Sequence, residues 1–172
     1  MTAVARSGGR ASAAAIVANL GYVAGGAGAV LATTAHGDPV DAVRWIALLS
    51  VGAVGVLAFI RHVIFAKEDA TRIGWTAEGG SNFQYETGFA NLAMGLVAII
   101  AVWADWGGAT YVTAVLAYGL YLLQAGIIHL WNWTRKDSHT HFLRSVAASL
   151  IFSGILLYYA LRAMSELNLA PF

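Results

Sequence analysis

Long apolar stretches, each about the length of a membrane-spanning helix, constrain the fold of this chain more than any other feature. The charged residues gather in short segments between these stretches. A helix needs about 20 apolar residues to cross a bilayer. Five stretches meet this requirement, at about 11–33, 40–66, 82–104, 109–134 and 141–164. We therefore predict an all-α fold, a polytopic bundle of about five transmembrane helices that forms a single domain over residues 1–172.

Composition excludes several other classes of protein. Charged residues make up 11% of the chain, against roughly 25% in soluble domains. A net charge of +1 argues against nucleic-acid binding. The absence of cysteine excludes disulfides, thiolate metal sites and cysteine catalysis. The first apolar stretch is longer than the core of a signal peptide, which has 7–15 residues, so we interpret it as a helix.

The basic residues predict an orientation, because they concentrate on the cytoplasmic side of membrane proteins. With five helices, one side of the membrane receives eight of the ten: Arg6, Arg10, Arg61, Lys67, Arg72, Arg135, Lys136 and Arg144. We therefore expect a multi-pass protein of a cell membrane with its N-terminus in the cytoplasm and its C-terminus outside. Small residues in the first helix, Gly21, Gly25, Gly26 and Gly28, predict a face that packs closely against another helix.

Ionisable residues from several helices fall at the same predicted depth. His62 and His129 each lie about one turn before the cytoplasmic end of a helix, and Glu86 lies about one turn after the start of another. At 1.5 Å per residue, all three lie within roughly 6–8 Å of the membrane boundary. Such residues are costly inside a membrane and are functional candidates by default. His62, Glu86 and His129 therefore form the candidate site.

Three interpretations of this polar layer remain open. His62, Glu86 and His129 are suitable ligands for a transition metal or an acid/base pair, as in a metal-dependent membrane oxidoreductase. In the second interpretation, the layer binds a lipid or another small ligand. In the third, the side chains merely reach toward water at the interface, and Glu86 is stabilised by the positive end of its helix.

Basic neighbours support the second interpretation. Arg61, Arg144 and the histidines, with His141 at the start of the fifth helix, are suited to an anionic lipid headgroup or a quinone oxygen.

Two amides in the third helix are predicted to support the bundle. Ser81 and Gln84 form a capping box that marks the start of this helix. Gln84 and Asn91 share a helix face, whereas Glu86 is about 140° from Asn91 around the axis. We therefore assign Gln84 and Asn91 to packing rather than to one narrow site with Glu86.

The motifs VGAVGVLAFIRHVIF, ATRIGW and FQYETGFANLAMG, at about 46–103, resemble a family of small bacterial integral membrane proteins of unknown function. The sequence departs from that family at Asn82, where proline is usual, and after His129, where a proline–glycine–asparagine turn is usual. The E-x-G-x-x-N-L-x-x-G pattern is more faintly similar to DoxX-like four-helix membrane proteins. The resemblance implies that these residues match the family pattern: His62, Gly74, Trp75, Phe83, Gln84, Glu86, Gly88, Asn91, Leu92, Gly95 and His129.

These observations predict a small integral membrane protein that acts as an accessory or structural subunit. Its expected partners are membrane lipids, further copies of itself in a homo-oligomer, or a larger membrane complex. The polar layer would bind a lipid or ligand near the cytoplasmic face. The alternative is the metal-dependent oxidoreductase-type enzyme that uses His62, Glu86 and His129, with a transition metal, a quinone or a lipid as the possible cofactor.

Overall fold

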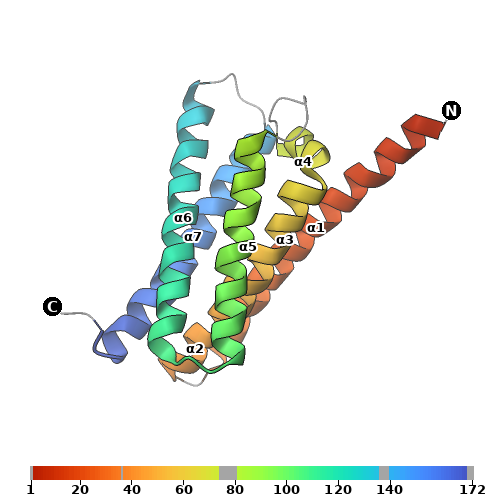
Figure 1. The fold of residues 1–172 in the computed structure, drawn as a ribbon. Helices are drawn as coiled ribbons and strands as arrows, with labels where there is room; N and C mark the ends of the chain where they lie inside the picture. The colour runs from red at the N-terminus through yellow and green to blue at the C-terminus, as the bar shows by residue number, and fades with distance from the viewer. Residues whose placement is uncertain (1, 36, 74–80, 136–139, 170–172) are drawn as a thin grey trace.

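The computed structural model describes residues 2–35, 37–73, 81–135 and 140–169, and every regular element within them is a helix. The chain begins with α1 (Thr2–Thr33). The second membrane-length segment runs without a break through α2 (Pro39–Trp45), the π-helix η1 (Ile46–Ala53), α3 (Val54–Phe59) and the π-helix η2 (Ile60–Ile64). Then follow α4 (Ala66–Ile73), α5 (Asn82–Trp103), α6 (Gly108–Arg135) and α7 (Thr140–Glu166) (Figure 1).

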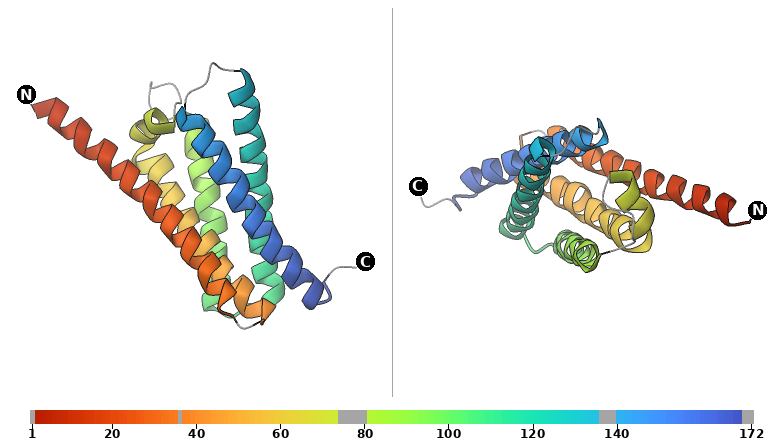
Figure 2. Two further views of the ribbon diagram at one scale, coloured as in Figure 1. Left: turned by 180° about the vertical axis from the view of Figure 1, so that it is seen from behind. Right: turned by 90° about the horizontal axis from the view of Figure 1, so that it is seen from above.

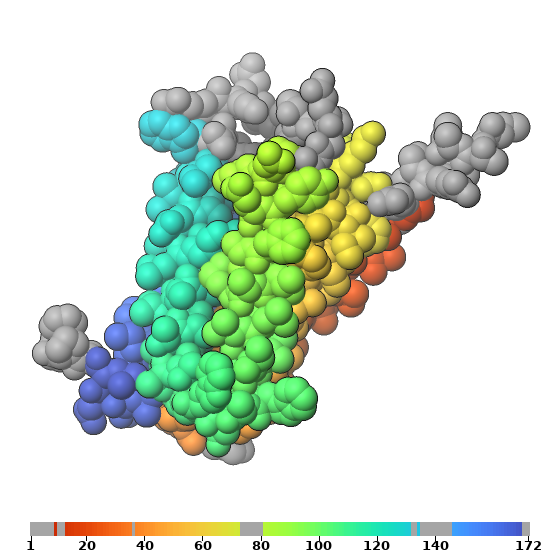
Figure 3. All heavy atoms as spheres, viewed as in Figure 1, coloured from red at the N-terminus to blue at the C-terminus, as the bar shows by residue number. Residues whose placement is uncertain are grey.

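The predicted all-α bundle is confirmed, with five helical segments long and apolar enough to cross a membrane in the described part of the chain. The bounds of the last four agree with the sequence prediction within two residues. Only α1 differs markedly, because the helix already begins at Thr2. Large apolar side chains such as Phe89 and Val97 remain exposed on α5, which occupies the middle of the face seen in Figure 3. A membrane-spanning helix presents such side chains to lipid.

Side chains cap two of the helix starts, including the predicted start at Ser81. The carboxylate of Asp38 accepts hydrogen bonds from the N–H groups of Val40 and Asp41, at 2.8 and 3.2 Å. Ser81 Oγ accepts from the N–H of Gln84 at 3.2 Å. In a complete capping box, the side chain of Gln84 would also accept from the N–H of Ser81. That bond does not form, and Gln84 Nε2 instead donates to the carbonyl of Ala66 at 2.7 Å. The buried amide of Gln84 therefore connects the start of α5 to the start of α4.

Glycines set the closest helix contacts. A Cβ atom added at Gly55 of α3 would lie 2.5 Å from the backbone oxygen of Asn91, and one added at Gly95 of α5 would lie 2.9 Å from the oxygen of Gly52. The glycines of α1 divide into two groups. Gly25 and Gly28 pack against α7 and η1, whereas Cβ atoms at Gly21 and Gly26 would contact nothing within 4 Å.

The bundle is tightly packed at one end and open at the other. The core cluster includes Val43, Ile46, Val102, Tyr111 and Ala160, and it lies toward the loop that joins α5 to α6, near α2. At the opposite end, which we call the α4 end, α1 slants away from the other helices (Figures 1 and 2). Helices α6 and α7 run beside each other along the bundle (Figure 2).

Candidate functional site

A cavity of about 670 Å³ lies between the spanning helices. Side chains from α1, α3, η2, α4, α5, α6 and α7 line it, and most of them are apolar, among them Val17, Leu57 and Phe152. Its volume falls within the range of roughly 300–1,000 Å³ that is usual for small-molecule sites. The glycines at Gly21 and Gly26 contribute to this space, because they place no side chain in it.

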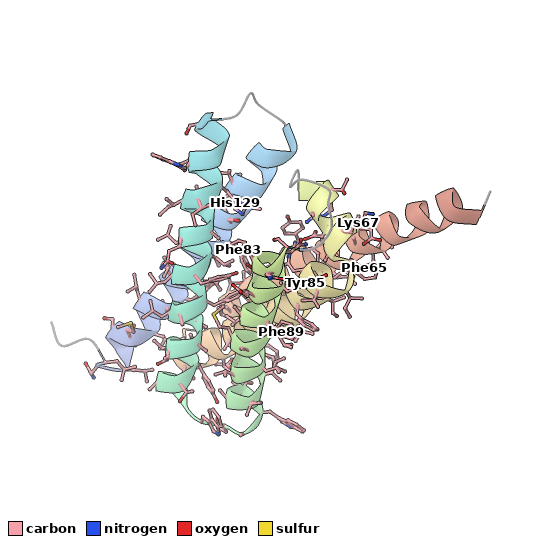
Figure 4. All side chains as sticks on the ribbon, turned by 45° about the horizontal axis from the view of Figure 1, so that its top comes forward. Phe65, Lys67, Phe83, Tyr85, Phe89 and His129 are labelled. Carbon is pink, nitrogen blue, oxygen red and sulfur yellow. The ribbon has the colours of Figure 1, made fainter. Side chains whose placement is uncertain are left out.

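The three residues of the predicted site all line this cavity. His62 comes from η2, Glu86 from α5 and His129 from α6. Figure 4 shows His129 on α6 and Phe83 near the start of α5, and both side chains belong to the cavity lining. Arg61 lines the cavity as well. The structure therefore brings residues from three helices to one cavity.

Two of the basic residues predicted for an anionic headgroup fall outside the described side chains. The side chains of His141 and Arg144 lie outside the part of the chain whose side chains the structure describes.

A buried carboxylate that the sequence analysis did not select organises the α4 end. Asp69 of α4 is fully buried. Its Oδ1 accepts hydrogen bonds from Nε and Nη2 of Arg72, at 3.0 and 2.8 Å. Its Oδ2 lies 2.9 Å from Nδ1 of His62 and 3.3 Å from Nε of Arg61. The contacts at Oδ2 lack the alignment of good hydrogen bonds, so we describe them as electrostatic.

The same cluster defines the protonation of His62. Nη2 of Arg61 lies 3.0 Å from Nε2 of His62. A guanidinium can only donate, so Nε2 accepts and the ring proton belongs on Nδ1, facing Asp69. Both ring nitrogens are therefore engaged, and a neighbouring guanidinium would repel a metal cation. His62 in this arrangement is a poor metal ligand.

The described residues do not form a metal site. No group of three or more histidine, aspartate or glutamate side chains within them has the geometry to hold a metal ion. His62, Glu86 and His129 share a cavity but do not converge on one point in the manner that a tetrahedral site requires.

Opposing effects act on the pKa of the Asp69 carboxyl. Burial by itself would raise the pKa of its carboxyl, because a charged group is costly away from water. The contact with His62 and the positive charges of Arg61 and Arg72 outweigh burial, and the pKa of Asp69 lies below its ordinary value. Asp69 is therefore ionised at neutral pH and holds both guanidiniums at the α4 end.

Asp69 carried a signal that the sequence analysis did not use. The segment that contains it, AKEDATRI, is amphipathic. Ala66 and Ala70 are buried on the same face of α4 as Asp69, three residues before it and one after. A single carboxylate on the small-residue face of a short helix indicates a buried charge that needs partners.

The π-helical turn η2 places Arg61 and His62. The N–H of Phe65 donates to the carbonyl of Ile60 at 3.2 Å, five residues back rather than four. This widened turn allows two consecutive side chains to contact the same carboxylate group. Such π-helical turns are frequent at functional sites.

Further along α5, a second polar group lines the cavity. Nδ2 of Asn91 donates to the carbonyl of Thr87 at 2.7 Å and to the hydroxyl of Tyr121 at 3.1 Å. Oδ1 of Asn91 accepts from the hydroxyl of Tyr118 at 2.7 Å. Asn91 therefore connects α5 to α6. The cavity is wide enough that Glu86 also lines it, although these two residues point in different directions around α5.

A bundle of membrane-length helices around a largely apolar cavity with a charged end defines a multi-pass helical membrane protein with an internal pocket. The chain belongs to the family of unknown function DUF6790, which matches residues 39–167. No curated protein and no solved structure matches it. The family match covers α2 to α7. Helix α1, which forms one wall of the cavity, lies outside the match. The resemblance to a family without known function is confirmed, and the fainter similarity to DoxX-like proteins stays a prediction.

Proposed function

We propose that this protein binds one amphipathic lipid in its cavity, with an anionic headgroup at the α4 end and acyl chains along the apolar walls. The observation that carries the proposal is the position of Arg61 and Arg72, which line one end of an otherwise mostly apolar cavity. Arginine suits this role because its planar guanidinium matches the oxygens of a phosphate or a carboxylate.

The charge of the cluster supports an anionic headgroup. With neutral His62, two guanidiniums and one carboxylate leave a net charge of +1. Asp69 is fully buried and does not line the cavity, whereas the side chains of Arg61 and Arg72 are 21% and 28% exposed. The guanidiniums therefore face the space that a ligand would occupy.

Glu86 adds a carboxylate to the headgroup site, which also contains two guanidiniums. Its side chain lines the same cavity as Arg61 and Arg72. A carboxylate can only accept hydrogen bonds when it is ionised. It is suited to an amine or a hydroxyl group on the headgroup, next to the phosphate at Arg61 and Arg72.

Lipid binding is one part of the function that the sequence predicts. An accessory role in a homo-oligomer or a larger membrane complex stays a prediction and is compatible with lipid binding. The metal-dependent alternative is not proposed, because both ring nitrogens of His62 are engaged and no metal-ligand group forms among the described side chains.

Binding is tested by titrating phosphatidylglycerol into the full-length protein in detergent and counting bound lipids by native mass spectrometry. We expect one tightly bound lipid. Arg72→Gln should weaken its affinity about ten-fold or more, because a hydrogen bond to a charged group contributes about 1.5–3 kcal/mol. Arg44→Gln, an equal charge change at an exposed residue outside the cavity, should have little effect.

A second variant separates binding from folding. Asp69→Asn combined with Arg72→Gln removes a matched pair of charges, so it leaves no uncompensated carboxylate. The double variant should be more stable than Asp69→Asn alone, yet it should still bind lipid weakly. Equal affinity in wild type, Arg72→Gln and Arg44→Gln would refute the proposal, as would the absence of any one-to-one complex.

A further inference from the structure

The hydrogen bonds around Asn91 have a fixed direction. The carbonyl of Thr87 can only accept, so the atom of Asn91 that lies 2.7 Å from it is the amide nitrogen. Oδ1 then faces Tyr118, whose hydroxyl donates to it at 2.7 Å. The other hydrogen of the amide points to the oxygen of Tyr121 at 3.1 Å. Asn91 is 3% exposed and Tyr118 is 1% exposed, so this direction is held by buried groups.

This arrangement leaves hydroxyl donors in the wall of the cavity. The oxygen of Tyr121 accepts from Asn91, which leaves its own hydrogen to donate. Tyr121 and Thr87 both line the cavity, so a hydroxyl hydrogen can be donated to an acceptor inside it.

The donor lies deeper in the bundle than the charged cluster. His62 of the cluster packs against Gly88 of α5, and Asn91 is three residues beyond Gly88, about 4.5 Å at 1.5 Å per residue. Arg61, Tyr118 and Tyr121 all line the same cavity. A ligand that contacts the guanidiniums with one group can therefore reach the hydroxyl donor with another.

We infer that Tyr121, with Thr87, recognises an uncharged carbonyl oxygen of the bound lipid, so that the ligand is an anionic glycerophospholipid with ester-linked chains. In such a lipid, an ester carbonyl follows the phosphate after a short glycerol linkage, in the order of the two polar regions of the cavity. A free fatty acid has only its carboxylate and offers no second acceptor. This inference rests on the proposed function, because it concerns the same cavity and the same lipid.

The test compares two lipids that differ only at the linkage. Diester phosphatidylglycerol and its diether analogue share a headgroup and chains, and only the diester has carbonyl oxygens. We expect wild type to bind the diester about five-fold more tightly, as one net hydrogen bond of about 1 kcal/mol requires. Tyr121→Phe should bind both lipids with equal affinity, at the level of the diether in wild type.

Two variants provide controls. Tyr85→Phe removes a hydroxyl from an exposed residue of α5 outside the cavity lining and should keep the five-fold ratio. Arg72→Gln should weaken both lipids and leave the ratio unchanged, because Arg72 contacts Asp69 at the α4 end and not the Asn91–Tyr121 group. Thermal unfolding of each variant shows whether loss of the five-fold preference comes from loss of the fold. If Tyr121→Phe unfolds at the same temperature as wild type, its lost preference reflects the missing hydroxyl.

The outcomes distinguish the inference from the proposed function. If neither lipid forms a one-to-one complex with wild type, the proposed function fails and the inference fails with it. If wild type binds both lipids equally, and Arg72→Gln still weakens both, the cavity binds lipid but Tyr121 does not recognise a carbonyl. If oleate displaces the diester at equal concentration, the ligand is a fatty acid and the inference is overturned.

Discussion

Replacing Asp69 with asparagine tests whether one buried carboxylate holds the α4 end together. The change keeps the shape of the side chain and removes a charge that contacts Arg61, His62 and Arg72. Breaking a buried ion pair costs about 3–5 kcal/mol, because the remaining partner is left uncompensated. The two arginine side chains are 21% and 28% exposed and regain some contact with water, so we expect the lower value.

The expected loss of about 3 kcal/mol corresponds to a fall in Tm of about 6–12 °C for a chain of this length. It is measured as thermal unfolding in detergent, followed by circular dichroism. Glu166→Gln neutralises an exposed carboxylate at the end of α7 and should shift Tm by less than about 1 °C, as surface substitutions usually do. Adding Arg72→Gln to Asp69→Asn should recover part of the loss, since the two residues interact directly.

A small effect would refute this reasoning. If Asp69→Asn lowers the stability by less than about 1 kcal/mol, the carboxylate is no more important than an exposed one, whose pairs contribute about 0–1 kcal/mol. The proposed headgroup site would then lack its structural support, since Asp69 is the group that both guanidiniums contact.

Three further predictions concern acid stability, helix packing and topology. Because the pKa of Asp69 is lowered, its contribution is fully present above its unfolded pKa of about 3.9 and is lost as pH falls through the folded value, so wild type should lose Tm in acid more steeply than Asp69→Asn. Gly55→Ala should cost about 1–3 kcal/mol by overpacking α3 against α5, whereas Gly154→Ala, with open space around it, should be neutral or slightly stabilising in the same unfolding assay. Because the chain has no cysteine, single cysteines can report its orientation, and a membrane-impermeant thiol reagent applied to intact cells should label Ser165→Cys but not Ser81→Cys.

The spanning helices were predictable because each carries its own signal. An apolar stretch of the right length defines a helix wherever it packs, and residues such as Asp38 and Ser81 mark where two of them begin. The starting point of α1 was not predictable in the same way. Its first residues are too polar for a span, and a helix that continues beyond the apolar stretch leaves no hydropathy signal.

The site was harder to predict than the fold. Depth along each helix follows from counting residues, and it placed His62, Glu86 and His129 at a common level, where all three line the cavity. The contacts between side chains depend on rotation about each helix axis and on close approach. The π-helical turn changes that rotation at His62, and the burial of Asp69 depends on how α4 folds back. Neither can be obtained from an ideal helix of 3.6 residues per turn.

The π-helical turn η2 also bears on how related chains are compared. A turn closed by a hydrogen bond over five residues contains one residue more than an ordinary α-helical turn. Deleting a single residue between Ile60 and Ile64 would leave a span of nearly unchanged length and hydropathy. The turn would then close as an ordinary α-helical turn, and the residues after it would keep nearly the same rotation about the helix axis. A one-residue alignment gap at this position would therefore mark chains that lack the widened turn, which here places Arg61 and His62 against one carboxylate, even where every residue of the cluster is retained.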